Sequence, residues 1–197
     1  MTLSGTTKLE AVNIILNTIG ETSTSTLSGT LPFEVASADA TLDEVTRALQ
    51  MDSYVFNTEY EVVLPVVTDI STGATRIPVP SNYLRVESHS GSEKYTIRNG
   101  FLYSMKEKTD SFSTKATLDV VFALEFVDLP EAAKRYVSIR AARVFADRMV
   151  GSKDIRAFTQ MDEYEAKAKL MNYEASVGDV NMLRDSADTY SIINRRI

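Results

Sequence analysis

Few residue types in this chain are suited to catalysis. The 197 residues include no cysteine and a single histidine, His89, which lies in the polar segment 88–93. A metal site without thiolates or a second imidazole would need a cage of carboxylates, which is typical of calcium or magnesium. No phosphate-binding loop, dinucleotide fingerprint or nucleophile elbow occurs either. We therefore expect no cofactor and no metal site, and we expect His89 to be a solvent-exposed loop residue.

Carboxylates are numerous, and a pair of them could act as acid and base on a glycosidic bond. Candidates include Asp162, Glu163 and Glu165. On a helix, however, Glu163 lies one turn from Lys167, and Glu165 lies one turn from Lys169. Such i,i+4 pairs stabilise an exposed helical face. The sequence therefore favours a solvated face over an acid–base site.

Three further charged residues share one surface of a predicted helix, namely Arg140, Arg143 and Asp147. They are candidates for a contact with another subunit. The alternative is an ordinary i,i+4 pair between Arg143 and Asp147 within the helix.

The segment 178–197 has too few apolar groups to fold alone, yet it carries several that a merely solvated tail would not need. A frayed, disordered end is one interpretation. We favour a tail that becomes ordered when it binds a partner. Its candidate contact residues are Asn181, Met182, Leu183, Tyr190, Ile192 and Ile193.

The composition is that of a soluble globular protein, with 44% hydrophobic and 24% charged residues. The net charge of −6 is unevenly placed, because residues 1–60 carry eight acidic and two basic groups, whereas residues 131–150 carry two acidic and five basic ones. This asymmetry favours contact between copies or partners, although scattered surface charge is the alternative. The overall acidity argues against a protein that grips nucleic acid. We expect no membrane span and no secretion signal.

Residue patterns predict two helices, a run of short strands and two more helices. A capping box at Thr7 and Glu10 begins the first helix, and Gly20 ends it. The second helix has its apolar residues at 4-3-4 spacing: Ala38, Leu42, Val45 and Leu49.

The β-prone residues follow between 54 and 128. The pair Asn99-Gly100 predicts a tight hairpin, because both turn positions need a positive φ. Alternating apolar residues from Leu118 to Phe126 predict a strand with one apolar face.

Helical periodicity returns after Pro130, and Gly151 separates the last two helices, with Ser152 as the N-cap of the second. The last helix has apolar residues at 4-3-4-3-4 spacing: Ala157, Met161, Tyr164, Ala168, Met171 and Ala175. We predict an α+β fold in which residues 1–53 and 129–177 form a four-helix bundle. An antiparallel β sandwich or barrel (54–128) is inserted between the second and third helices, and 178–197 is an extended docking tail.

The order and spacing of short motifs along nearly the whole chain resemble the tail tubular protein A family, the adaptor or gatekeeper ring of short-tailed phages. Tyr54 stands where the family often has tryptophan. The matching residues are Leu9, Ala11-Val12-Asn13, Ile15-Leu16, Ile19-Gly20-Glu21, Ser25-Thr26-Leu27, Gly29, Phe56-Asn57, Arg98-Asn99-Gly100, Leu102-Tyr103, Leu129-Pro130-Glu131, Ala141-Ala142-Arg143, Arg148, Gly151 and Asn181-Met182-Leu183.

The resemblance implies a structural adaptor and not an enzyme. It implies a dodecameric ring in the virion tail, assembled in the host cytoplasm, that joins the portal protein to the tail nozzle protein and continues the channel through which DNA leaves. DNA would pass without sequence-specific binding, and an acidic lumen would suit that passage. Portal docking would involve the helices and the tail.

Two alternatives remain open from the sequence. The first is a carboxylate-based glycan hydrolase associated with the tail, and the second is a head-completion protein with a different neighbour.

Overall fold

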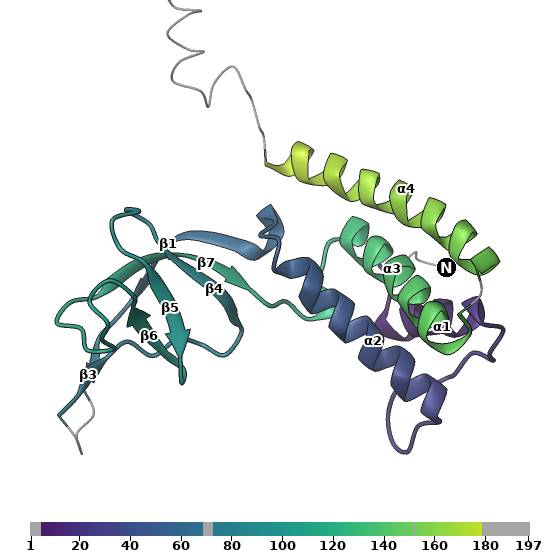
Figure 1. The fold of residues 1–197 in the computed structure, drawn as a ribbon, viewed down its shortest axis with the longest axis horizontal. Helices are drawn as coiled ribbons and strands as arrows, with labels where there is room; N and C mark the ends of the chain where they lie inside the picture. The colour runs from purple at the N-terminus through teal and green to yellow at the C-terminus, as the bar shows by residue number, and fades with distance from the viewer. Residues whose placement is uncertain (1–4, 69–72, 152, 179–197) are drawn as a thin grey trace, which may run out of the picture.

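The computed structural model describes residues 5–68, 73–151 and 153–178. The molecule is elongated, with the helices gathered at one end and the strands at the other (Figure 1). The chain passes from two helices into the strands and back into two helices, so the fold is α+β and the strands are inserted between the second and third helices.

The helices begin and end largely where the residue patterns place them. Thr7 caps α1 through the predicted capping box with Glu10, and Gly20 follows its end with φ of 81°. Pro130 is the N-cap of α3, and Gly151, with φ of 67°, follows its end. The helices are α1 (Lys8–Thr18), α2 (Phe33–Gln50), α3 (Glu131–Met149) and α4 (Lys153–Val177).

Helix α3 is the central helix of this end of the molecule. It packs against α1, α2 and α4, and α1 also packs against α2. Helix α4 therefore lies on α3, on the side away from the α1–α2 pair (Figure 1). None of the described helices is long and apolar enough to span a bilayer.

Within the described residues, the strands form three small antiparallel sheets. The largest has the order β1-β7-β4, and the others are the pairs β2-β3 and β5-β6. Asn99 and Gly100 join β5 to β6 with φ values of 52° and 77°, which confirms the predicted hairpin. The strands are β1 (Thr58–Leu64), β2 (Val67–Thr68), β3 (Thr75–Arg76), β4 (Tyr83–Ser88), β5 (Tyr95–Arg98), β6 (Phe101–Ser104) and β7 (Ala116–Phe122).

Each half of the molecule has its own hydrophobic core. The helical core includes Ile15, Leu42 and Phe145, and the β core includes Ile77 and Leu118. All five side chains are almost fully removed from solvent. Burial of this kind is the main driving force for folding, so each half has its own source of stability.

The predicted strand from Leu118 to Phe126 is too long, because β7 ends at Phe122. The buried amide of Gln50 at the end of α2 takes the place of a neighbouring strand for Leu124, accepting from its N–H at 2.6 Å and donating to its carbonyl at 3.0 Å. Phe126 then enters the short 3₁₀ helix η2 (Phe126–Asp128) and packs into the helical core. The alternating pattern therefore crosses the junction between the two cores.

The apolar residues that the sequence predicts to be the buried face of α4 lie on its exposed face. Ala166 and Leu170 are its buried residues, whereas Met161, Tyr164 and Met171 are 65%, 64% and 50% exposed. Ala168 and Ala175 are also exposed, and the side chain of Ala157 lies outside the described residues. Two apolar stripes at helical spacing occur on α4, and α3 covers the one that also carries Glu163.

Candidate functional site

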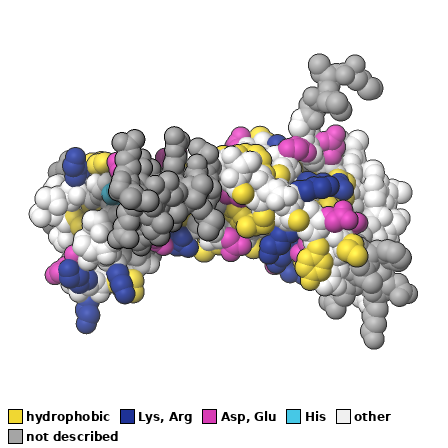
Figure 2. All heavy atoms as spheres, turned by 90° about the horizontal axis from the view of Figure 1, so that it is seen from above, with side chains coloured by type: hydrophobic (Ala, Val, Ile, Leu, Met, Phe, Trp, Pro, Cys, Tyr) yellow, Lys and Arg dark blue, Asp and Glu magenta, His cyan; other side chains and the backbone are white. Residues whose placement is uncertain are grey.

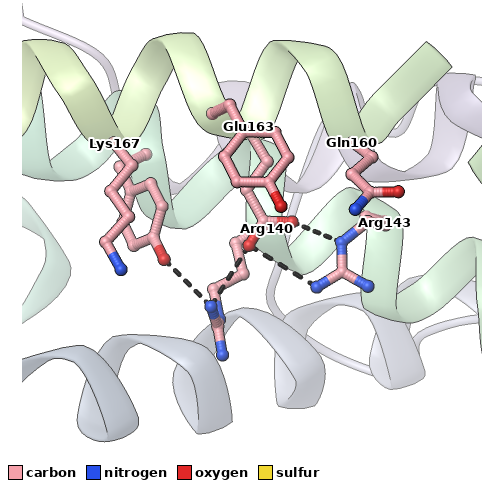
Figure 3. A pocket seen from close by; sticks show the side chains of 7 residues that line it. Arg140, Arg143, Gln160, Glu163 and Lys167 are labelled. Atoms are coloured by element: carbon pink, nitrogen blue, oxygen red, sulfur yellow. Dashed lines mark hydrogen bonds and ion pairs between the residues drawn. The ribbon is translucent and has the colours of Figure 1, made fainter. Parts of the chain in front are cut away.

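A pocket of about 360 Å³ lies where α4 crosses α3. Helix α3 contributes three residues to its lining and α4 contributes four, and both sets are spaced by one turn so that they share a face. Figure 3 shows their side chains meeting between the two helices. The lining residues are Tyr136, Arg140, Arg143, Gln160, Glu163, Tyr164 and Lys167.

Two arginines of α3 hold the carboxylate of Glu163. Arg140 Nη1 donates to Glu163 Oε1 at 3.1 Å, and Arg143 Nε donates to Glu163 Oε2 (Figure 3). The Glu163 side chain is 13% exposed, against 23% for Arg143 and 41% for Arg140. The hydrogen bond to Glu163 raises the pKa of Arg143. Because Glu163 is removed from water and paired, it ties α4 to α3.

A tyrosine and an aspartate support these arginines from within α3. Tyr136 Oη accepts a hydrogen bond from Arg140 Nη1 at 2.9 Å. Arg143 Nη1 donates to Asp147 Oδ2 at 3.4 Å, which is the i,i+4 pair considered from the sequence. The structure therefore brings together the three predicted residues Arg140, Arg143 and Asp147, and it adds Glu163 to them.

The predicted i,i+4 pair of Glu163 with Lys167 on a solvated face is wrong, because Glu163 turns toward α3. Lys167 lies instead at the rim of the pocket. Three cationic side chains and one carboxylate thus line the pocket, and the two arginines are already paired with Glu163.

The carboxylates considered for glycoside hydrolysis do not share a cleft. Glu163 lines the large pocket with both oxygens engaged by arginine. Asp162 and Glu165 line a separate pocket of about 40 Å³, far smaller than the sites that enclose small-molecule ligands. This trio therefore does not provide an acid and a base on either side of a sugar.

His89 is exposed, as predicted, but it does not lack partners. Its Nδ1 lies 2.8 Å from Asp119 Oδ1, and its Nε2 lies 3.3 Å from Glu61 Oε1. The hydrogen bond to Asp119 raises the pKa of His89. Glu61 lies at an irregularity of β1 with φ of 60°, and its N–H also donates to Asp119 Oδ1 at 3.1 Å. His89 and Asp119 thus support a bulge in an edge strand.

Within the described ranges, no three His, Cys, Asp or Glu side chains are grouped so that they could hold a metal ion. The candidate tail residues Asn181, Met182, Leu183, Tyr190, Ile192 and Ile193 lie outside the described residues.

Sequence reasoning missed the α4 side of the pocket. Gln160, Tyr164 and Lys167 recur at spacings of four and three residues, which places them on one flank of a helix. This spacing predicts a shared flank, but the sequence does not show which face of α3 that flank would contact.

The described residues thus form an elongated α+β chain with a pocket between α3 and α4 and with large apolar side chains exposed on α4. A family model described as tail tubular protein matches residues 9–180, and the chain belongs to that family. It is also 30% identical, over 157 residues, to tail tubular protein A of Klebsiella phage KP34, with 79% of this chain and 81% of the relative covered. The chain is thus a structural protein of the phage tail.

Proposed function

We propose that this protein is the adaptor of the tail, and that twelve copies form a ring between the portal and the nozzle. The ring would continue the channel for DNA, which would pass through without sequence-specific binding. Membership of the tail tubular family supports this role, because a tubular part of a tail is made of repeated subunits.

One observation carries the proposal furthest. Helix α4 exposes Met161, Tyr164 and Met171, and Tyr164 also lines the pocket between α4 and α3. These three side chains recur at helical spacing, and exposed apolar residues grouped on one side of a helix favour a site of protein contact. An adaptor needs such surfaces because each subunit must bind both its neighbours and its partners.

We further propose a division of labour along the chain. Residues 1–53 and 129–177 would be a helical body that faces the portal, 54–128 would be a β module, and 178–197 would be the tail that docks on the portal. Arg140, Arg143 and Asp147 would supply charged contacts with portal or neighbouring subunits. Acidic residues would face the lumen, where they would repel the DNA backbone.

Binding to purified portal and to purified nozzle protein tests the adaptor role. We expect the full chain to bind both, with assembly in the host cytoplasm before incorporation into the virion tail. A chain that bound only one of them would be a head-completion or nozzle accessory protein, which would contradict the adaptor role.

Deletion of 178–197 tests the docking tail. We expect loss of portal binding with an unchanged circular dichroism spectrum and melting temperature, because the described residues of both hydrophobic cores lie before residue 178. Unchanged portal affinity of a folded, truncated chain would overturn the docking role of the tail.

A further inference from the structure

Helix α4 carries a row of apolar side chains that stay exposed among the described residues. Met161, Tyr164 and Met171 are at least half exposed, and two alanines in the same row are exposed as well. Figure 2 shows the molecule from above, the side on which α4 lies in Figure 1, with hydrophobic side chains at the surface of the helical half interleaved with charged ones. The exposed stripe of α4 consists of Met161, Tyr164, Ala168, Met171 and Ala175.

The tail, residues 178–197, begins where this stripe ends. Helix α4 ends at Val177, and the N–H of Gly178 donates to the carbonyl of Glu174 at 2.8 Å. The apolar residues of the tail lie beyond Gly178, outside the described residues, and form two groups: Met182 and Leu183, then Tyr190, Ile192 and Ile193. Burial of apolar surface is favourable, and the stripe is the exposed apolar surface next to the start of the tail.

The length of the tail fits the length of the stripe. At about 1.5 Å per helical residue, Met171 lies about 10 Å and Met161 about 26 Å before Gly178 along the helix axis. At about 3.3 Å per extended residue, Leu183 can lie up to about 16 Å and Tyr190 up to about 40 Å from Gly178. The first apolar group can therefore return as far as Met171 and the second as far as Met161, with length to spare for the reversal.

Covalent attachment favours the tail of the same chain over other occupants. A segment joined to its site by a short flexible linker is present there at an effective concentration of about millimolar. Another copy in dilute solution competes at a far lower concentration. Ordering the tail costs conformational entropy, so the contact is reversible.

One cation beside the stripe suits the charges of the tail. Lys167 is exposed, lines the pocket next to Tyr164 and forms no ion pair with a described residue. Asp185 and Asp188 lie between the two apolar groups of the tail. When both groups lie on the stripe, these aspartates pass along α4, where either can pair with Lys167.

We propose that in the free chain the tail turns back at Gly178 and lies along α4, with its apolar residues on the exposed stripe. The contact shields the stripe from other molecules until the tail leaves. One consequence rests on the proposed function: a tail that docks on the portal must first leave α4, so docking would uncover the stripe only in chains that have reached the portal.

Thiol reactivity tests this contact, because the chain has no cysteine of its own. Ala168→Cys places a thiol in the stripe, and Lys169→Cys places one on another flank of the same helix; both positions are exposed. We expect the thiol at position 168 to react with a maleimide at least fivefold faster when Leu183→Asp and Ile192→Asp are added. The thiol at position 169 is the matched control, and its rate should not change.

The free chain is measured without portal, so that this contact and the adaptor role fail separately. Equal rates at position 168 with and without the tail substitutions would overturn the proposal and leave the adaptor role untouched. Protection that appears only as the protein concentration is raised would show that the tail of another copy covers the stripe, which would also overturn it. Protection independent of concentration, in a chain that does not bind portal, would support the contact and contradict the adaptor role.

Discussion

At the scale of single residues, two buried amides join the helical half to the β half. Gln50 and Asn57 are both fully buried. Gln50 binds both backbone groups of Leu124, and Asn57 Nδ2 donates to the carbonyls of Gln50 at 2.8 Å and Phe122 at 3.0 Å. The sequence shows no signal for this junction, because an isolated Gln or Asn has no periodicity and its partners lie up to 74 residues away.

Replacing Gln50 with Ala should destabilise the protein. The N–H and C=O of Leu124 would lose their partners, and an unsatisfied buried group costs about 1–3 kcal/mol. We expect the free energy of unfolding, measured in urea, to fall by about 2 kcal/mol. The exposed Gln160→Ala is the control and should change it by less than about 0.5 kcal/mol. Equal, small effects of the two substitutions would contradict the bridging role of Gln50.

His89 gives a pH dependence with a defined sign. Its pKa is raised by Asp119, so the protonated form stabilises the folded state. That stabilisation is fully present below the unfolded pKa of about 6.5 and is lost as the pH rises through the higher folded-state pKa. We expect part of the decline in melting temperature between about pH 6 and pH 8 to disappear in His89→Gln. Identical pH profiles for the wild type and the variant would show that His89 does not stabilise the β1 bulge.

At the scale of elements, the sequence correctly predicted local features such as caps and turns, but it did not predict which face of α4 is buried. The capping box at Thr7 and the Asn99-Gly100 turn depend on atoms a few residues apart, so the sequence alone predicted them. The buried face of α4 depends on α3. Both stripes of α4 have helical spacing, and the one that positions Glu163 beside Arg140 and Arg143 is buried. Periodicity alone cannot rank two such stripes.

Adjacent residues on α4 test which stripe is buried. Leu170 is fully buried in the helical core, whereas Met171 is 50% exposed. Leu170→Ala should lower the free energy of unfolding by about 2–4 kcal/mol through lost contacts and a cavity. Met171→Ala should change it by less than about 0.5 kcal/mol, while weakening assembly. The reverse order in a urea titration would show that the apolar face predicted from the sequence is the one α3 covers.

At the scale of the whole molecule, the α+β class and the insertion of the strands between helices followed from the changes in residue period. The elongated shape did not, because it reflects two separate cores joined by Gln50 and Asn57. Surfaces that the fold leaves open are equally invisible to pattern analysis, since an apolar stripe has the same sequence whether a helix of the same chain or another molecule covers it.

The most direct test of the adaptor role is the mass of the assembly, measured by light scattering with and without the portal of the same phage. We predict a defined complex in which twelve copies of this chain are bound to the portal. The free chain should be smaller or only weakly associated. A chain that remains monomeric and unbound in the presence of portal would contradict the account.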